Sequence, residues 1–414
     1  MTRDITRRSM LKTTAAIGAA SALPMIPFAA EAGDDIIVGG LHDLSGFIDF
    51  AGIPMNQIML MAIEEINAAG GLLGKKLKGA VYDPQTKMPL YSQFATQLAL
   101  KDKASVVRGG ITSASRETIR PILHRYKTLY FYNTLYEGGV CDRNEISLGT
   151  TPAQTVEKLV PYSMGLWGKK VYTIAADYNY GQITAAWVKR YVEQNGGEVV
   201  STDFFPLDVT NFGPTISKIQ SAKPDMVMSV LVGTGHLGFY NQWAAAGMKN
   251  EIPIASTTFG AAGAELEILK PEVANGILTC YGYYPSIDSP ANKEWVAKVN
   301  KRYPDKTPLL SELSAFTWEG MMIWADAVRS AGSLDRMKLI EVMESGKTYD
   351  MPSGQCAIDP LTHHAIRDVY IADLQDKTYI IKKKFSQVQP ADTQLVCNLK
   401  ETPNANKHYE ISLE

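Results

Sequence analysis

Short apolar runs typical of buried strands alternate with segments of helical periodicity along most of the chain. The clearest unit starts with the strand-like run at 35–41 and continues into 55–71, where apolar residues recur on one helical face. Further strand-like runs follow at 76–83, 105–111 and 128–133. Strands that are separated by helices pair in parallel, so we expect an α/β fold with a doubly wound parallel sheet.

The alternation restarts after residue 168 and continues to about residue 284. Strand-like runs occupy 169–178, 197–205, 226–232, 252–257 and 276–284. A chain of 414 residues also exceeds the roughly 250 to 300 residues at which a single core stops growing. We therefore expect two doubly wound lobes, covered in part by the helical segments that begin near residue 292.

The N-terminus has the pattern of an export signal. The paired residues Arg7 and Arg8 precede a moderately apolar stretch at 13–30, and small residues follow up to Ala32. Two prolines interrupt the stretch, which is shorter than the roughly 20 apolar residues that a membrane anchor needs. We expect a twin-arginine signal peptide over 1–32, cleavage after Ala32 and a periplasmic mature protein.

Composition and motifs exclude several classes of function. Forty-one basic and forty-three acidic residues give a net charge of -2, and the longest basic run is 382–384, so no nucleic-acid partner is expected. The sequence has no zinc-protease, P-loop or nucleophile-elbow motif, and the pair His363-His364 has no carboxylate at ligand spacing. We expect no metal, no cofactor and no enzymatic activity. The four cysteines are Cys141, Cys280, Cys356 and Cys397; their pairing cannot be read from the sequence.

A glycine motif of the form G-x-G-x-x-G spans 233–238, after a strand and before a helix. A dinucleotide site also needs an acidic residue about 20 positions later, where this chain has Ser256, Thr257 and Thr258. The motif therefore does not indicate a dinucleotide. Gly233 and its neighbours either allow a small ligand to approach the backbone or only shape the turn.

Hydroxyl and aromatic side chains gather where the predicted strands end. Ligands of open α/β sheets bind beyond the carboxyl ends of the strands. The candidates at these ends are Ile111 and Ser113, Tyr132 and Thr134, and Tyr178 and Tyr180. Ser113 also opens a helix, whose first N–H groups have no partner within the helix. Together these residues predict a pocket of aromatic walls and neutral polar groups.

Several longer stretches carry a resemblance to a known family. These are GGLHDLSG, AIEEINAAGGLLGKKL, TSASRETIRPIL, FYNTLYEGGVC, NFGPTISKIQSAKPD and DPLTHH. They resemble the urea and short-chain amide branch of the type I periplasmic solute-binding proteins, over nearly the whole mature chain. The resemblance implies the solute-binding component of an ABC importer, whose partners are the membrane permease subunits.

The resemblance also implies roles for individual residues. Ser113 and Thr134 would hydrogen-bond the ligand from the first lobe, with Ile111 and Tyr132 as walls, and the second lobe would contribute its own set. That set is Tyr178, Tyr180, Val232 and Gly233. Two departures from the family pattern are Ile111, where an aromatic residue is usual, and Asn133, where proline is usual.

The lobes are expected to exchange segments of the chain. Lobe 1 would comprise 33–155 and 283–352, and lobe 2 would comprise 156–282 and 353–414. Short crossovers near 150–156, 281–285 and 350–356 predict a multi-strand hinge, about which the lobes close on the ligand.

The expected ligand is neutral, because none of the candidate pocket side chains is ionised at neutral pH. A free amino acid would need a carboxylate for its ammonium group, since a buried unpaired charge is costly. Urea or a short aliphatic amide fits better, with its carbonyl accepting from Ser113 and its NH2 group donating to Thr134 or tyrosine. Ile111 in place of an aromatic residue favours an amide with an alkyl tail.

Three alternatives remain open. A branched-chain amino acid binding protein would use the same fold with a different ligand. An amide-sensing regulator of that fold would have no need of an export signal. An exported amidase would need a nucleophile with a base, or a metal, and the sequence offers neither.

Overall fold

This computed structural model describes residues 35–411 except 234 and 305–308. The expected signal peptide, with Arg7, Arg8 and the cleavage point at Ala32, lies outside the described residues. None of the described helices has both the length and the apolar composition needed to span a bilayer.

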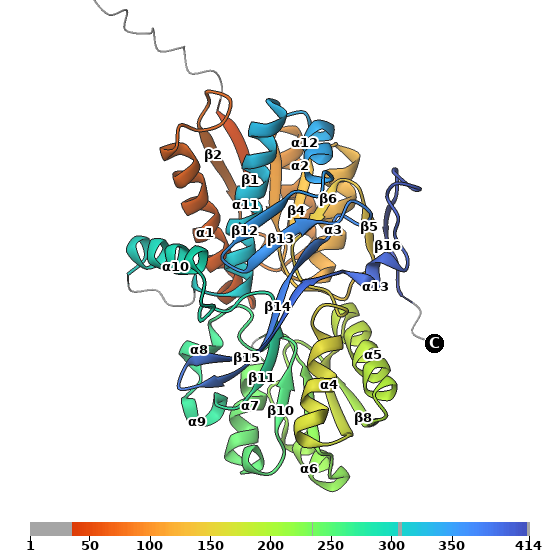
Figure 1. Cartoon of the computed structure of the whole chain (residues 1–414). Coiled ribbons are helices and arrows are strands. Elements are labelled where there is room, and N and C mark those ends of the chain that lie inside the picture. The colour runs from red at the N-terminus through yellow and green to blue at the C-terminus, as the bar shows by residue number, and fades with distance from the viewer. Residues whose placement is uncertain (1–34, 234, 305–308, 412–414) are drawn as a thin grey trace, which may run out of the picture. The chain divides into compact units, whose positions relative to one another are not determined.

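The first sheet has five parallel strands in the order β2-β1-β3-β4-β6. Its strands are β1 (Ile36–Leu41), β2 (Leu77–Tyr82), β3 (Val106–Gly109), β4 (Leu129–Tyr132) and β6 (Glu145–Ser147). Its helices are α1 (Asp49–Ala68), α2 (Met88–Leu100), α3 (Ser113–Arg125), α11 (Glu312–Ala331) and α12 (Arg336–Met343). This lobe occupies the upper half of Figure 1.

The inner strands β3 and β4 carry apolar side chains on both faces because helices cover both. Val106 packs in the cluster that contains α1 and α11, and the next residue, Val107, packs in the cluster that contains α2 and α3. In β4, Phe131 packs in the cluster of α1 and α11, and Tyr130 packs in the cluster of α2 and α3. Successive side chains of a strand point to opposite faces, which explains the continuous apolar runs in the sequence.

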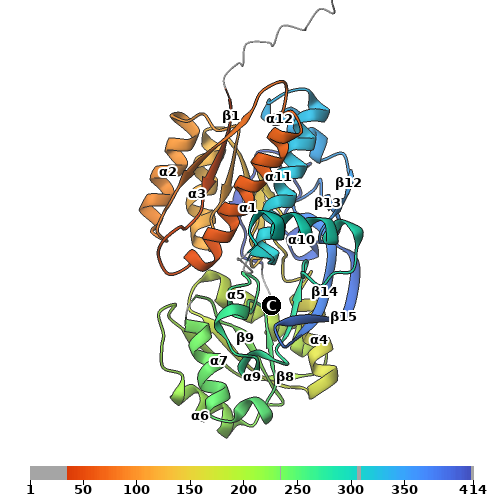
Figure 2. The same ribbon diagram turned by 90° about the vertical axis from the view of Figure 1, so that its left-hand side faces the viewer.

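The second sheet has the order β12-β13-β14-β11-β10-β9-β7-β8, with β15 paired to β14. Its parallel part is β7 (Lys170–Ala176), β8 (Glu198–Phe205), β9 (Met226–Val230), β10 (Ile254–Ser256) and β11 (Leu278–Tyr281). Its larger helices are α4 (Val156–Trp167), α5 (Asn179–Gln194), α6 (Gly213–Ala222) and α7 (Gly235–Ala245). The expected pair of doubly wound α/β lobes is confirmed (Figure 2).

The last strands of the second sheet are antiparallel. They are β12 (Thr348–Met351), β13 (Gly354–Ile358), β14 (Ala365–Gln375) and β15 (Thr378–Val388). Asp376 and Lys377 join β14 to β15 with positive φ angles of 46° and 64°, as in a tight hairpin. A hairpin reverses the chain without a helix, so the antiparallel pairing follows from the turn.

The C-terminal segment 353–414, expected in the second lobe, divides between the lobes. Strand β14 is longer than β11, and the residue just before it, His364, bridges to Ser147 of the first sheet. Farther along, β16 (Asn406–His408) pairs with β5 (Val140–Asp142), and Cys397 forms a disulfide with Cys141. The exact limits of the lobes stay a prediction, but this tail ties both parts of the chain together.

Buried polar contacts hold the segments that pass between the sheets. Glu312 of α11 accepts from the backbone N–H of Gly282 at 2.6 Å, directly after β11. Glu319 of the same helix forms a buried ion pair with Arg367 of β14 at 3.3 Å.

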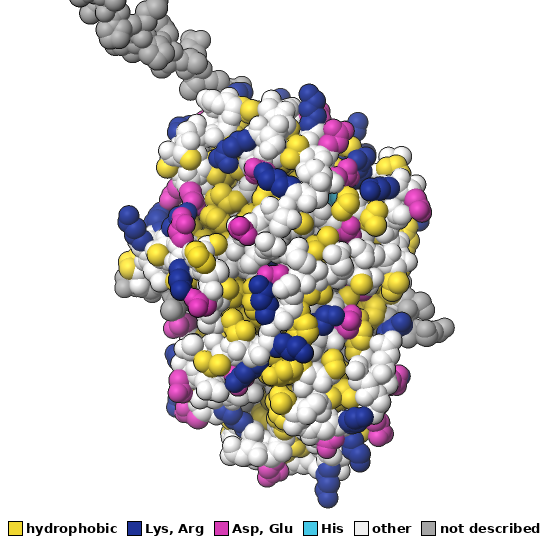
Figure 3. Space-filling view, in the orientation of Figure 1, with side chains coloured by type: hydrophobic (Ala, Val, Ile, Leu, Met, Phe, Trp, Pro, Cys, Tyr) yellow, Lys and Arg dark blue, Asp and Glu magenta, His cyan; other side chains and the backbone are white. Residues whose placement is uncertain are grey.

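The surface carries charges of both signs. On the face in Figure 3, Lys and Arg side chains are interspersed with Asp and Glu.

The disulfide should stabilise the folded protein, because it closes a long loop in the unfolded chain. Its cysteines are 256 positions apart, and breaking a bond of this kind costs on the order of 2–4 kcal/mol of unfolding free energy. We expect denaturant unfolding of the oxidised protein to shift to lower concentration on addition of a reductant. Cys397→Ser should match the reduced protein and be insensitive to the reductant; a wild type that ignores the reductant contradicts the prediction.

Candidate ligand-binding site

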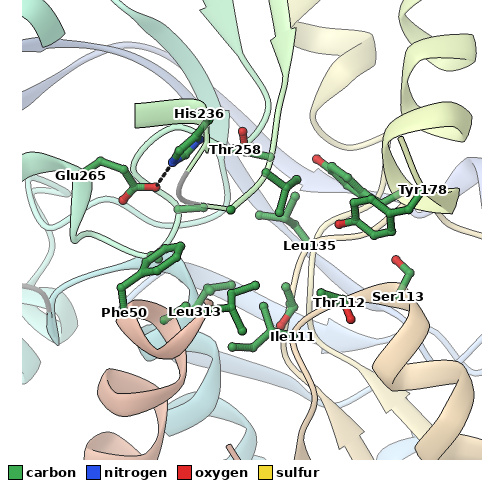
Figure 4. A pocket seen from close by; sticks show the side chains of 18 residues that line it. Phe50, Ile111, Thr112, Ser113, Leu135, Tyr178, His236, Thr258, Glu265 and Leu313 are labelled. Carbon is green, nitrogen blue, oxygen red and sulfur yellow. Dashed lines mark ion pairs between the residues drawn. The ribbon is translucent and has the colours of Figure 1, made fainter. Parts of the chain in front are cut away.

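A cavity of about 70 Å³ lies among the carboxyl ends of strands from both sheets. A single water needs roughly 10–15 Å³ on this scale, so the cavity suits a small molecule. Loops after β3, β4, β7, β9 and β10 form it, together with the start of α1 and of α11. None of the described residues that line it is Lys or Arg. Figure 4 shows these side chains converging from different elements.

The structure places seven of the eight predicted residues on the cavity wall. They are Ile111, Ser113, Thr134, Tyr178, Tyr180, Val232 and Gly233. The eighth, Tyr132, ends β4 and lies behind the wall, where its hydroxyl donates to the carbonyl oxygen of Ile111 at 2.7 Å. Tyr132 thus supports Ile111 and is not part of the lining.

One end of the cavity, here called the serine end, carries neutral polar groups and comprises Thr112, Ser113, Thr134 and Tyr178. Thr112 caps α3, since its hydroxyl accepts from the backbone N–H of Ser115 at 3.1 Å. Thr112 and Ser113 at the start of α3 both line this end of the cavity, where the first N–H groups of the helix have no partner within it.

A buried ion pair stands directly behind Ser113. The Ser113 hydroxyl donates to Oε2 of Glu137 at 2.5 Å, and Oε1 of Glu137 accepts from Nη2 of Arg116 at 3.0 Å. All three side chains are buried. Because the Ser113 proton already binds Glu137, this hydroxyl offers its lone pairs to a ligand. The expectation that Ser113 donates to a ligand carbonyl does not agree with this hydrogen bond, in which its proton is directed to Glu137.

The tyrosines of the second lobe are neutral donors. Burial raises the pKa of Tyr178 and of Tyr180 above the usual range. The Tyr180 hydroxyl shares a hydrogen bond with the hydroxyl of Thr257 at 3.1 Å. Hydroxyls that stay protonated can donate to a carbonyl oxygen, the role that Ser113 does not fill.

The other end of the cavity, here called the acid end, comprises Phe50, His236, Thr258 and Glu265. Nε2 of His236 lies 3.5 Å from Oε1 of Glu265, and both side chains are buried. Burial raises the pKa of Glu265 to about 7 and lowers the pKa of His236 to about 4. Between the two ends the wall is apolar.

Eleven lining residues were absent from the predicted set. They are Ile48, Phe50, Ala51, Thr112, Leu135, His236, Thr258, Ala261, Ala262, Glu265 and Leu313. The strand-end rule could have found Thr258, two positions beyond β10. Nothing in the sequence marks Phe50 or Glu265, each nine positions beyond the end of a strand, or Leu313, which comes from a distant helix.

The glycine motif serves the turn and the cavity together. Gly233 has a φ of +81° and lines the cavity, and α7 starts two residues later. A Cβ atom at Gly235 would meet the carbonyl oxygen of Val209 at 2.7 Å, so this position needs a close approach of two backbones. Gly238 has no such constraint, because its nearest neighbour would be 3.7 Å away.

Each histidine of the pair His363-His364 has a polar partner within the fold. Nε2 of His363 lies 2.8 Å from Oε1 of Glu344, and Nε2 of His364 is hydrogen-bonded to the hydroxyl of Tyr136. Within the described part of the chain, no three His, Cys, Asp or Glu side chains are grouped in a way that could hold a metal ion.

Comparison with known proteins identifies the family. The family model described as periplasmic binding protein domain matches residues 36–394, most of the chain. The chain belongs to this family. The twin-arginine translocation signal model matches residues 4–24, which confirms the export signal, and the protein is periplasmic.

Two relatives illustrate the family at the level of sequence. The Leu/Ile/Val-binding protein homolog 6 of Brucella melitensis is 25% identical over 308 residues, covering 72% of this chain and 78% of that protein. The leucine-, isoleucine-, valine-, threonine-, and alanine-binding protein of Pseudomonas aeruginosa is 25% identical over 309 residues, covering 72% and 79%.

Solved structures confirm the type I fold. The amino acid ABC transporter substrate-binding protein of Pseudomonas fluorescens superposes with a TM-score of 0.80 at 20% identity, covering 89% of this chain and all of that one. A solute-binding protein of Rhodopseudomonas palustris, in complex with 3,4-dihydroxybenzoic acid, superposes with a TM-score of 0.78 at 22% identity, covering 86% and 99%.

The buried carboxyl of Glu265 should make stability depend on pH. Its folded pKa of about 7 exceeds the ordinary 4.5, so its contribution is fully present below pH 4.5 and is lost as the pH rises through 7. The free energy of unfolding of the wild type should fall with rising pH, whereas that of Glu265→Gln lacks this term. We therefore expect the difference between the two proteins to grow in favour of Glu265→Gln by about 2 kcal/mol from pH 5 to pH 8. Chemical denaturation across this range measures the gain. Glu267→Gln, on the exposed side of the same short helix, is the control, and an equal gain there would contradict the prediction.

Proposed function

We propose that this protein is the solute-binding component of an ABC importer and binds a short-chain aliphatic amide between its lobes. Family membership and the twin-arginine signal support a role in capture outside the cytoplasm. The proteins of Pseudomonas fluorescens and Rhodopseudomonas palustris that share this fold are a substrate-binding and a solute-binding protein of ABC transporters. The membrane permease subunits of such an importer are the proposed partners.

The observation that carries the amide proposal is the neutral character of the serine end. Its hydroxyls complement both halves of a primary amide: Ser113 accepts from the NH2 group, and Tyr178 or the first N–H groups of α3 donate to the carbonyl. The carboxylate behind Ser113 is already paired with Arg116. A ligand ammonium at this end would find no free carboxylate, and its burial would cost more than the loss of a neutral hydrogen bond.

The apolar middle of the cavity favours an alkyl tail over urea. Ile111, Leu135, Val232 and Leu313 contribute side chains to it. Each buried CH2 group contributes about 0.8 kcal/mol, a term that urea lacks. We therefore place urea below propionamide or butyramide as a ligand.

A branched-chain amino acid is the second candidate. The relatives from Brucella melitensis and Pseudomonas aeruginosa, which are named for branched-chain amino acids, favour it, and so does the same apolar middle. Against it stands the paired state of Glu137, which leaves the serine end without a free carboxylate for an α-ammonium group; Glu265 lies at the other end of the cavity.

Calorimetric titration tests the ligand class. We expect propionamide and butyramide to bind more tightly than urea, with no binding of leucine. Ser113→Ala should weaken amide binding about tenfold, because the amide NH2 group loses its acceptor. Ser163→Ala is the matched control, a buried serine of α4 whose hydroxyl donates to the carbonyl oxygen of Leu159. Binding of leucine without any amide would refute the proposal.

Closure of the lobes on the ligand should be visible in solution. Residues of both lobes line the cavity, so a ligand that contacts both stabilises the closed state. We expect the radius of gyration from small-angle scattering to fall when butyramide is added at saturation. Ser113→Ala at the same butyramide concentration should show a smaller change. An unchanged radius for the saturated wild type contradicts hinge closure.

A further inference from the structure

Three polar atoms at the acid end of the cavity have no hydrogen-bond partner among the described residues. They are Nδ1 and Nε2 of His236 and Oε2 of Glu265. The side chains of His236 and Glu265 are only 3% and 2% exposed. Their mutual contact of 3.5 Å lacks hydrogen-bond geometry. A buried polar group without a partner costs on the order of 1–3 kcal/mol, so a ligand group that pairs with these atoms would gain a comparable stabilisation.

The unpaired atoms of His236 and Glu265 differ from other buried polar atoms without a partner because they belong to side chains that line the cavity. Buried side-chain atoms without a partner also occur in Trp187, Trp243 and Trp295, which do not line the cavity. Within the described residues, His236 and Glu265 are the cavity-lining side chains that have such atoms. A ligand that fills the cavity therefore contacts both side chains, and a rotation of either would turn its buried polar atoms toward the ligand.

The charges at the acid end select the kind of group that it can bind. Neutral His236 has one donor and one acceptor nitrogen, and Glu265 adds carboxyl oxygens with no Lys or Arg in the described lining to pair with them. Acceptors therefore outnumber donors. An anionic ligand group would meet an unpaired carboxyl, whereas an amine would supply the missing donors.

The two ends of the cavity lie apart, with the apolar middle between them. In Figure 4, Ser113 and Tyr178 are at one end, and Phe50, His236 and Glu265 are at the other. A plain alkyl tail that extends from the serine end would leave the polar atoms of His236 and Glu265 unpaired. A tail with a terminal amine would pair them.

We propose that His236 and Glu265 bind a primary amine at the far end of the ligand, so that the preferred solute is an aliphatic amide with an amino group on its tail. This inference rests on the proposed binding of an amide at the serine end. It adds a second polar anchor and fixes the orientation of the ligand in the cavity.

Matched pairs of ligands test the proposal. Butyramide and 3-aminopropanamide have the same number of heavy atoms and differ only by a terminal methyl group or ammonium. Pentanamide with 4-aminobutanamide, and hexanamide with 5-aminopentanamide, extend the series by one methylene each. We expect the amino member of at least one pair to bind at least about tenfold more tightly to the wild-type protein, measured by calorimetry.

Two variants assign this preference to the acid end. Glu265→Gln removes the carboxylate at nearly constant volume and should abolish the preference for the amino member. Glu267→Gln, exposed on the same helix, should retain it. If Glu265→Gln does not fold, as judged by circular dichroism, His236→Gln supplies the same test and should reduce the preference.

The outcomes separate this inference from the proposed function. Alkyl amides that bind as tightly as their amino partners in all three pairs would overturn the inference and leave amide binding intact. A preference that persists in Glu265→Gln and His236→Gln would overturn it as well. Failure of every amide, alkyl and amino alike, would refute both proposals.

Discussion

The buried ion pair between Arg116 and Glu137 fixes the geometry on which the rest of the site depends. Further contacts of both charges offset the cost of burying such a pair. Glu137 also accepts from Ser113, and Nε of Arg116 donates to Glu117. Nη1 of Arg116 has no hydrogen-bond partner among the described residues, but the guanidinium lies over the rings of Tyr132 and Tyr136 at 5.2 and 4.3 Å. The start of α3, the end of β4 and the chain that follows are thereby held in one arrangement. Removing Glu137 would free the Ser113 hydroxyl to rotate and leave Arg116 with Glu117 as its ion-pair partner.

Parallel pairing in both sheets explains why the cavity has two chemically different ends. Each sheet brings the carboxyl ends of its strands to one edge, and the loops at that edge are free to vary in chemistry without disturbing the core. The first lobe contributes the serine end through Thr112, Ser113 and Thr134, while the second contributes His236 and Glu265. A ligand held at both ends bridges the lobes, which couples recognition to closure.

The tail and the crossing segments limit how the lobes can move. The disulfide from Cys141 to Cys397 and the pairing of β16 with β5 return the end of the chain to the first lobe. Glu319 and Arg367 form a buried pair between α11 and β14, close to the crossings. Rigid lobes joined by several ordered segments favour rotation about a hinge over independent motion.

The sequence by itself determined the fold class and the export signal, and it predicted seven of the eighteen described residues that line the cavity. Apolar periodicity defines strands and helices locally, and parallel pairing then places each strand end at the ligand edge, which is why Thr134 and Tyr180 could be predicted. Only the tertiary structure decided that Ser113 donates to Glu137, that Cys141 pairs with Cys397, and that His236 meets Glu265. These contacts join residues 24 to 256 positions apart. Local patterns do not specify which loops become neighbours, because that depends on how the crossover helices pack on each sheet.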